Sequence, residues 1–348
     1  MRTRIGRSTI AAMCIAVLAG GCGGEKKTAE ESAPATAAST TLVLYSGRSE
    51  GLVEPVIALF EKETGIDVQV KYGNTPELAL TLREEGERGG ADLFWAQDAG
   101  ALGAVSKAGL FADLPADVVA GVPELFKHSG GKWVATSGRA RVLAYSPERV
   151  KPEQLPKSVF DLTDARFRGR VAWAPTNASF QAFVTAMRKT HGEDTTRTWL
   201  EAMKKNGTHA HANNVAILQA IARGEVDYAL PNHYYLLNFK KSEAKFPVDQ
   251  VAFAPGDVGN LINVAGIGIL ATATHRDAAE RFVRFVLSPT AQQYFASEVS
   301  EYPVIDNVMT NARLVTREEL LKSAPRVTLD DLDDLDGTLA LLRSVGLL

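Results

Sequence analysis

Two adjacent tyrosines, Tyr234 and Tyr235, are the residues whose type and spacing most clearly suggest chemistry. Deprotonated phenols are hard, anionic oxygen ligands suited to a trivalent cation, and such a cation would remove protons from groups whose free pKa is about 10. Neighbouring residues in a strand point to opposite faces, whereas at a strand-to-helix corner both can face one cleft. The alternative for an arbitrary pair is one tyrosine packed in the core and one exposed.

Gly47-Arg48-Ser49-Glu50-Gly51 matches the G-x-S-x-G elbow of serine hydrolases and lies between an expected strand and an expected helix. A hydrolase elbow needs an earlier strand and loop to supply half of the oxyanion hole. Only one short strand precedes this motif. Ser49 is therefore better explained as a helix start or a ligand contact, and a serine hydrolase using Ser49 remains a distant alternative.

Glycines and histidines supply weaker signals. Residues 266–271 fit a loose dinucleotide pattern, but the glycines lie inside a β run with no helix directly after them, which favours a strand crossing between lobes. His209 and His211 would share one face of a strand and read as surface histidines, because no cysteine or carboxylate cluster accompanies them. His233, beside the tyrosines, remains open as a metal ligand.

The sequence predicts alternating strands and helices, and these elements must position the residues named above. Strands are expected at 41–45, 66–72 and 92–96, each followed by a helix (49–64, from a capping Thr75, and 98–109), which predicts a mostly parallel sheet. A second αβ series begins at 170, residues 261–270 form a long β run, and the acidic stretch 330–336 is expected to be a solvated helix start. Two αβ lobes follow. Ligands bind beyond the carboxyl ends of such strands, which directs attention to the corners 46–50, 96–98, 175–179 and 231–235.

The N-terminus predicts export. Residues 1–21 combine arginines with an apolar run too short to span a bilayer, and Ala19-Gly20-Gly21-Cys22 is similar to a lipobox whose cysteine is acylated. An ordinary secretory signal with an incidental cysteine is the alternative. Residues 22–40 are expected to form a lipid-anchored flexible tether. The net charge of −3 becomes more negative once the basic segment is removed, so nucleic acid is not expected as a partner.

Almost the whole folded chain resembles the periplasmic ferric-ion-binding proteins, from Leu42-Val-Leu-Tyr-Ser-Gly to Glu301-Tyr-Pro-Val. The other similar stretches are Phe60-Glu-Lys-Glu-Thr-Gly-Ile, Glu84-Glu-Gly, Gly90-Ala-Asp-Leu-Phe, Ser137-Gly-Arg-Ala-Arg-Val, Pro175-Thr-Asn, Asn214-Val-Ala-Ile-Leu-Gln-Ala and Asn232-His-Tyr-Tyr. The resemblance implies an α/β, type II-like, two-lobed binding protein with a mixed sheet in each lobe and hinge strands between them. We expect lobe 1 to span 41–141 plus 264–312, and lobe 2 to span 142–263 plus 313–348.

The resemblance also implies a ligand set. The family's tandem tyrosines bind Fe(III) and fall on Tyr234 and Tyr235. A synergistic anion, carbonate or phosphate, is held in that family at positions that fall here on Asn177, Ala178, Ser179, Asn213 and Asn232. Residues 175–179 open a helix, whose free N–H groups and dipole favour an anion.

Two departures from the family pattern matter. The family's histidine and glutamate ligands fall on Ser49 and Gln97, and the extra tyrosines of one branch fall on Glu50 and Phe180. Two phenolates leave a trivalent ion one charge short of neutrality, so exogenous anions should complete the shell. Their candidate partners are Arg48, Arg139 and Arg141. Glu50 and Gln97 are further candidate metal ligands, whereas Phe180 is expected to pack.

The expected function is that of an exported solute-binding lipoprotein of an ABC importer. It would lie at the outer face of the cell membrane or in the periplasm, anchored by acylated Cys22. We expect it to be a monomer and to have no enzymatic activity. Ferric iron is the expected cargo, passed to a permease and an ATPase. The alternative is a binding protein for an organic anion such as a sugar phosphate or phosphonate.

Overall fold

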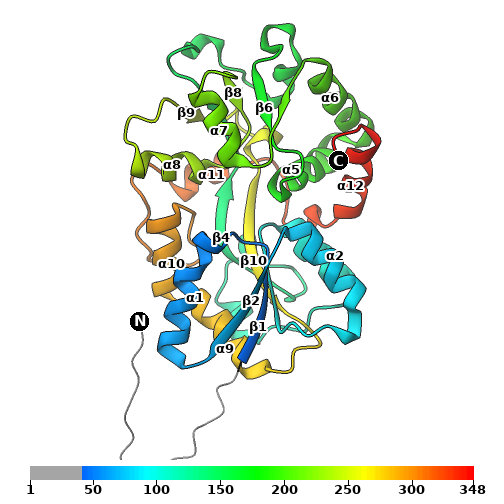
Figure 1. Ribbon diagram of the computed structural model, residues 1–348, viewed down its shortest axis with the longest axis vertical. Coiled ribbons are helices and arrows are strands. Elements are labelled where there is room, and N and C mark those ends of the chain that lie inside the picture. The colour runs from blue at the N-terminus through cyan, green and yellow to red at the C-terminus, as the bar shows by residue number, and fades with distance from the viewer. Residues whose placement is uncertain (1–40) are drawn as a thin grey trace, which may run out of the picture. The chain divides into compact units, whose positions relative to one another are not determined.

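The computed structural model describes residues 41–348, which contain two five-stranded sheets (Figure 1). The predicted export signal, the acylated Cys22 and the tether lie outside the described residues. The first sheet has the order β2-β1-β3-β10-β4 and the second β7-β6-β8-β5-β9. The strands are β1 (Thr41–Ser46), β2 (Asp67–Tyr72), β3 (Leu93–Ala96), β4 (Val134–Ala140), β5 (Leu143–Tyr145), β6 (Val171–Trp173), β7 (His209–Ala210), β8 (Tyr228–Ala229), β9 (Asp249–Val251) and β10 (Ile262–Ile269).

Both sheets are mixed. In the first, β1 pairs in parallel with β2 and β3, whereas β10 runs antiparallel to β3 and β4. In the second, β6 is parallel to β7 and β8, and β5 is antiparallel to β8 and β9. The mixed sheets and the α/β class are confirmed. The mostly parallel first sheet was wrong, because the long β run inserts beside β3 in the opposite direction.

Helices follow most of the strands, as the alternating pattern predicted. They are α1 (Glu50–Thr64), α2 (Thr75–Glu85), α3 (Ala99–Lys107), α4 (Ala116–Ala120), α5 (Ala178–His191), α6 (Glu193–Lys205), α7 (Asn214–Ala222), α8 (His233–Ser242), α9 (Arg276–Val286), α10 (Pro289–Tyr294), α11 (Arg317–Ser323) and α12 (Leu335–Ser344). A π-helical turn, Phe295–Val299, extends α10. In the described part of the chain, no helix has the length and apolarity needed to cross a membrane.

Local signals explain where several helices begin and end. Gly65 ends α1 with a φ of 70°, in the left-handed region that glycine adopts most easily. Asp98 caps α3 by accepting a hydrogen bond of 3.1 Å from the Ala101 N–H. Thr75 does not cap α2, because Asn74 occupies that position. Its hydroxyl instead donates to the Gly47 carbonyl and accepts from the Gln97 N–H, so it ties two strand-to-helix corners together.

The chain passes from the first sheet into the second over only two residues, Arg141 and Val142, which separate β4 from β5. The Arg141 N–H donates to the Leu261 carbonyl at the start of the β10 region, and the Val142 N–H donates to Pro231, just before α8. These bonds place the crossing next to the corner that carries the tyrosines. The proposed lobe boundaries at 141 and 263 remain predictions.

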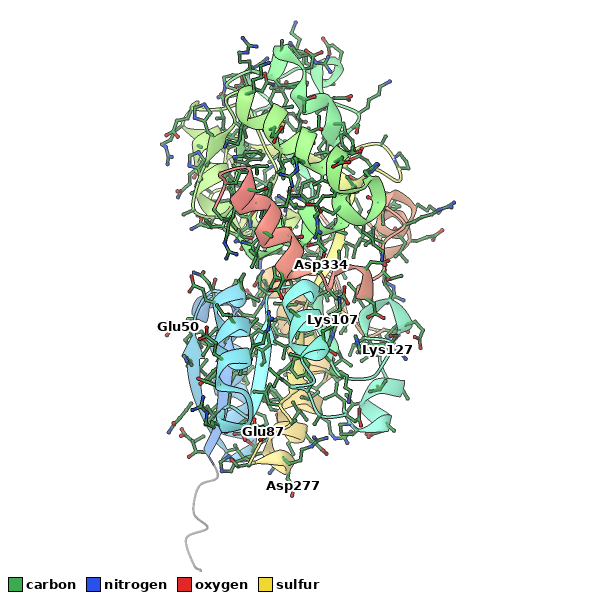
Figure 2. The ribbon with its side chains drawn as sticks, turned by 90° about the vertical axis from the view of Figure 1, so that its right-hand side faces the viewer. Glu50, Glu87, Lys107, Lys127, Asp277 and Asp334 are labelled. Carbon is green, nitrogen blue, oxygen red and sulfur yellow. The ribbon has the colours of Figure 1, made fainter. Side chains whose placement is uncertain are left out.

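The acidic stretch 330–336 leads into α12 as expected, with Asp334 and Asp336 exposed, and some of its aspartates also form ion pairs. Asp334 lies at the start of α12, on the side where α3 ends with Lys107 (Figure 2). Asp334 pairs with Arg188 at 2.8 Å and Asp333 pairs with Lys107 at 2.9 Å. The stretch therefore attaches the C-terminal helix to α5 and α3 by ion pairs, which local sequence patterns do not show.

Close packing explains the two glycines of β10. A Cβ atom on Gly266 would lie 2.8 Å from the Val134 carbonyl oxygen and 2.7 Å from a Leu102 methyl carbon. One on Gly268 would lie 2.5 Å from the Phe111 ring. Neighbouring strands and side chains fill the space where a nucleotide would have to approach. The glycines therefore serve close packing rather than nucleotide binding.

We expect Gly266→Val to lower the free energy of unfolding by about 1–3 kcal/mol, because the added carbons meet a backbone carbonyl that cannot move aside. Urea denaturation followed by circular dichroism measures this. Gly51→Ala is the control: Gly51 is exposed in α1 with open space around it, so alanine should stabilise the protein by roughly 0.5–1 kcal/mol. Equal urea midpoints for Gly266→Val and the wild type would contradict the packing argument.

Candidate functional site

The tyrosine pair lies at a strand-to-helix corner, where both side chains can face one region. α8 begins at His233 directly after the β8 corner, so Tyr234 and Tyr235 occupy its first turn. Their rings stack with centroids 4.2 Å apart and planes at 29°. Tyr234 is fully buried, and Tyr235 is partly exposed. The pair therefore presents one phenol to the cleft and holds the other behind it.

Gln97 joins Tyr234 to the first sheet. Its Nε2 donates to the Tyr234 hydroxyl at 3.1 Å, and its Oε1 accepts from the Arg48 guanidinium at 3.2 Å. The Arg139 guanidinium donates to the Gln97 main-chain carbonyl. Residues from the β3–α3 corner, from β4 and from the β1–α1 corner thus form one network that reaches the buried phenol through Gln97.

Glu301 forms the central ion pair of the site. Its two carboxylate oxygens accept from Arg48 at 2.9 and 2.8 Å, and both side chains are fully buried. The Ser137 hydroxyl donates to the same carboxylate at 2.6 Å. Glu301 follows the π-helical turn and Ser300, whose φ of 63° redirects the chain. Glu301 lies in a stretch that resembles the family, but no residue pattern around it indicated this role.

Burial controls the protonation of the group at the centre of the site. It raises the pKa of the Tyr234 hydroxyl well above its usual range, and Tyr235 and Glu301 act in the same direction, while Arg48 and Arg139 oppose them. Burial likewise raises the pKa of Asp98, beside Arg139, to about 6. Burial therefore favours the neutral form of the Tyr234 phenol. A bound cation would have to supply the free energy of its deprotonation.

Several buried guanidinium N–H groups have no acceptor among the described residues. They are Arg48 Nε, Arg139 Nε and Nη1, and Arg141 Nε. A buried donor without an acceptor loses its hydration with no compensation. Phenolates or a bound anion near Arg48 and Arg139 would supply the missing acceptors. The charge balance of the site therefore favours an anionic occupant.

A cleft of about 520 Å³ opens beside Tyr235. The first residues of α1, α2, α5 and α7 line it, so four helix N-termini with their partial positive charge converge there. Glu50 stands at the start of α1 (Figure 2), whereas the first turns of α5 and α7 carry no acidic residue. Asn177 and Asn213 cap α5 and α7 by accepting N–H bonds of 3.1 and 2.9 Å. A bound anion would accept hydrogen bonds from the other backbone N–H groups at these helix N-termini.

The predicted residues divide into two groups. The cleft is lined by Arg48, Ser49, Glu50, Gln97, Asn177, Ala178, Asn213 and Tyr235. The others are buried outside its lining: Tyr234, Ser179, Asn232, Arg139 and Arg141. Arg141 donates to the carbonyls of Ser179 and Leu230 and packs on Phe180. The expected packing role of Phe180 agrees with its contacts with Trp173 and Arg141.

Both ring nitrogens of His233 contact main-chain groups. Its Nδ1 accepts from the Ala140 N–H at 3.1 Å and its Nε2 lies 2.9 Å from the Ser300 carbonyl, which fits one neutral tautomer. Burial lowers the pKa of His233 from 6.5 to about 4. With both nitrogens occupied, it is available neither to a metal nor as a base for Ser49. Within residues 41–348, no group of three or more His, Cys, Asp or Glu side chains could hold a metal ion.

Comparison with known proteins gives consistent matches. A family model described as a bacterial extracellular solute-binding protein matches residues 90–334. The Fe(3+)-binding periplasmic protein of Serratia marcescens is 33% identical over 298 residues, 85% of this chain and 87% of that protein. Iron uptake protein A2 of Synechocystis is 34% identical, over 82% of this chain and 84% of that protein. The crystal structure of iron-bound HitA from Pseudomonas aeruginosa superposes with a TM-score of 0.84 at 33% identity, covering 88% of this chain and 99% of that one.

The lowered pKa of His233 predicts a pH dependence of stability. Between pH 6.5 and about 4 the unfolded chain binds a proton at this histidine that the folded chain does not, so the free energy of unfolding falls as the pH falls through this window. The contribution reaches about 3 kcal/mol. His233→Gln should remove it and flatten the curve of unfolding free energy against pH. His209→Gln, at an exposed strand residue, should leave the slope unchanged. Parallel curves for wild type and His233→Gln would refute this.

Proposed function

The chain belongs to the periplasmic ferric-iron-binding proteins of the bacterial extracellular solute-binding family, and we propose that it captures ferric iron with a small anion for an ABC importer. The Serratia and Synechocystis relatives are named for Fe(3+) binding and iron uptake, and the Pseudomonas structure is iron-bound. The tyrosine pair is the observation that carries the proposal. Its stacked phenols stand beside a cleft rimmed by helix N-termini.

Tyr234 and Tyr235 would act as the two charged metal ligands. As phenolates they neutralise two of the three charges of Fe(III), and the neutral Gln97 leaves the third unmatched. Glu50, at the cleft wall, is a candidate carboxylate for that charge. Gln97 would contribute mainly by donating its Nε2 hydrogen bond to the Tyr234 oxygen, a bond that strengthens when the phenol becomes a phenolate.

A synergistic anion, carbonate or phosphate, would complete the iron shell. Asn177, Ala178 and Asn213 line the cleft at two helix starts and would hold it, with Arg48 on the opposite wall. Ser179 and Asn232 would support these walls from behind. Arg139 would stabilise the phenolates electrostatically, because it lies close enough to Tyr234 to lower the pKa of that hydroxyl.

An organic anion such as a sugar phosphate or phosphonate is the second candidate cargo. The observation that favours it is the combination of an uncharged Ser49 and Gln97 with a cleft of about 520 Å³, much roomier than carbonate needs. The same helix N-termini and Arg48 would bind its phosphate group. The tyrosine pair favours iron, since a phosphate site has little use for two stacked phenols.

The remaining parts of the proposal concern location and partners. Acylated Cys22 would anchor the protein at the outer face of the cell membrane or in the periplasm, with residues 23–40 as a tether. A permease and an ATPase would receive the cargo, and the protein would work as a monomer without enzymatic activity.

Adding Fe(III) with bicarbonate to the metal-free protein should produce a visible phenolate-to-iron charge-transfer band at one iron per chain. Tyr234→Phe and Tyr235→Phe should each shift and weaken the band, and the double variant should abolish it. Absorbance titration and metal analysis measure this. Tyr72→Phe is the matched control, because Tyr72 lines the same cleft but bonds to Glu54. A colourless protein that binds sugar phosphates would establish the second candidate instead.

Cys22→Ser should move the protein from the membrane fraction to the soluble fraction of the producing bacterium, because the acyl chains would have no attachment site. Cell fractionation with immunoblotting and the mass of the purified mature chain test this. An unacylated wild-type product in the soluble fraction would exclude the anchor while leaving the iron proposal intact.

A further inference from the structure

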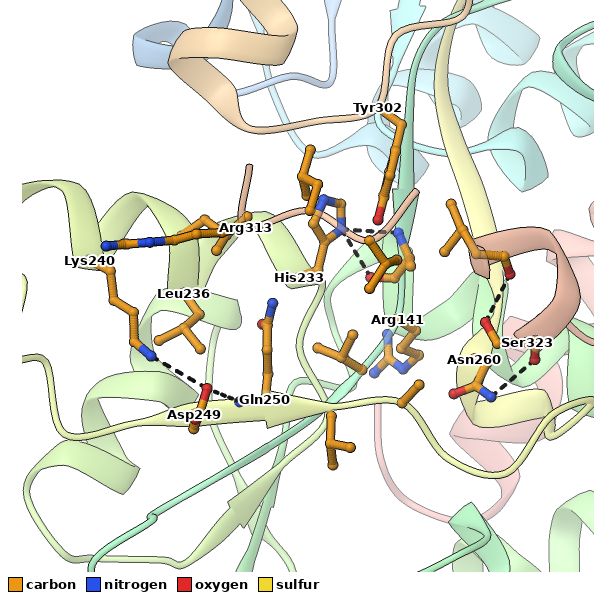
Figure 3. A pocket seen from close by; sticks show the side chains of 18 of the residues that line it. Arg141, His233, Leu236, Lys240, Asp249, Gln250, Asn260, Tyr302, Arg313 and Ser323 are labelled. Carbon is orange, nitrogen blue, oxygen red and sulfur yellow. Dashed lines mark hydrogen bonds and ion pairs between the residues drawn. The ribbon is translucent and has the colours of Figure 1, made fainter. Parts of the chain in front are cut away.

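A second cavity, of about 650 Å³, lies at the crossing between the two sheets (Figure 3). It is lined by residues 140–142 between β4 and β5, by α8, by β9, and by the segment from Arg313 through α11. It shares no lining residue with the cleft beside Tyr235. The two cavities therefore use different side chains, and any ligand of the second one would be distinct from the proposed iron and its anion.

Arg141 gives this cavity a buried positive charge without a carboxylate partner. Its side chain is almost completely buried, and within residues 41–348 it forms no ion pair with a carboxylate. Its two terminal nitrogens donate to the carbonyls of Ser179 and Leu230, whereas Nε lacks an acceptor. Burial, and then the charge of Arg139, lowers the pKa of Arg141 to about 9. An anion in the adjoining cavity would relieve the cost of this buried cation.

The charged groups around the cavity are mostly cationic. The side chain of Gln250 rises from β9 into the cavity (Figure 3), and its buried Oε1 is an acceptor that lacks a hydrogen-bond donor. Arg313 lines the cavity and makes no ion pair with a described carboxylate. Lys240 is paired with Asp249 at 3.4 Å, so the cavity's one carboxylate is already matched by a cation. The cavity thus has an excess of positive charge.

Apolar side chains form much of the remaining wall. Leu236 and Leu237 of α8, Val142 and Val251 of the second sheet, and Leu314 and Leu320 on the C-terminal side line it. A phosphate or carbonate ion would leave this apolar surface exposed to water. A molecule with an apolar body and one anionic group would cover the leucines and valines while placing its charge near Arg141 and Arg313.

From this combination we infer a second ligand site at the crossing, which takes an organic carboxylate or sulfonate with an apolar body. Arg313 binds its anionic group, the buried charge of Arg141 attracts that group from behind the wall, and the leucines of α8 and α11 contact its body. The site borders α8, whose first turn holds the tyrosine pair, yet it does not require iron. It is therefore tested independently of the proposed cargo.

8-Anilinonaphthalene-1-sulfonate is a suitable probe, because it combines an aromatic body with one sulfonate. We expect the metal-free mature protein to bind it once per chain with enhanced fluorescence. N-phenyl-1-naphthylamine, the same body without the sulfonate, should bind at least several-fold more weakly. Arg313→Gln should weaken sulfonate binding roughly three- to five-fold, as expected for an exposed charge. Arg317→Gln is the matched control, since Arg317 lies on the same segment but pairs with Asp306 outside the cavity.

Two substitutions of opposite charge at Val315 give a second test of whether the cavity prefers an anion. Val315 lines the cavity and is 52% exposed, so neither lysine nor glutamate there should disturb folding. Val315→Lys should tighten sulfonate binding and Val315→Glu should weaken it, while both leave the neutral probe unaffected. The inference is overturned if the two probes bind equally well, or if sulfonate affinity is the same in Val315→Lys, Val315→Glu and wild type. Loss of iron binding alone would not affect it.

Discussion

The buried pair of Arg48 and Glu301 is the interaction on which the geometry of the site depends. Its partners are 253 positions apart, so it joins the first strand-to-helix corner to the segment that follows the π-helical turn. Two charges removed from water are tolerated when they are paired and hydrogen-bonded, and the bidentate contact with Arg48 together with the Ser137 hydroxyl satisfies the Glu301 carboxylate, while Arg48 keeps one N–H without an acceptor. Arg48 in turn orients Gln97, which reaches the buried phenol. The tyrosine pair is therefore held from both sheets.

Gln97 illustrates why a departure from a familiar ligand pattern need not abolish a site. An amide has both a donor and an acceptor, so it accepts from the cationic Arg48 while donating to the Tyr234 hydroxyl. A carboxylate at this position could accept from both neighbours but could not donate to a phenolate. Gln97 thus suits a site in which the phenol carries the charge and an exogenous anion supplies the remainder.

Residue types and spacing predicted the structural features that depend on interactions between neighbours in the sequence. The strand-helix alternation, the Gly65 and Asp98 helix signals, and the corner that carries the tyrosines could all be read from residue types and spacing. Contacts between distant segments could not. Glu301 looked like one more acidic residue, Thr75 looked like a helix cap, and Arg141 looked like a cleft residue although it faces the cavity at the crossing. Each was decided by a partner that no short pattern identifies.

The complete burial of Tyr234 affects the rate at which a bound ligand exchanges as well as its affinity. A competing chelator that approaches from solvent meets Tyr235 and the cleft wall first, and has no direct path to the inner phenol oxygen. Exchange at that oxygen must wait for a fluctuation that separates Gln97 from α8. The dwell time of anything bound there would then follow the frequency of that opening. A ligand held this way would be shielded from competing chelators until the site opens.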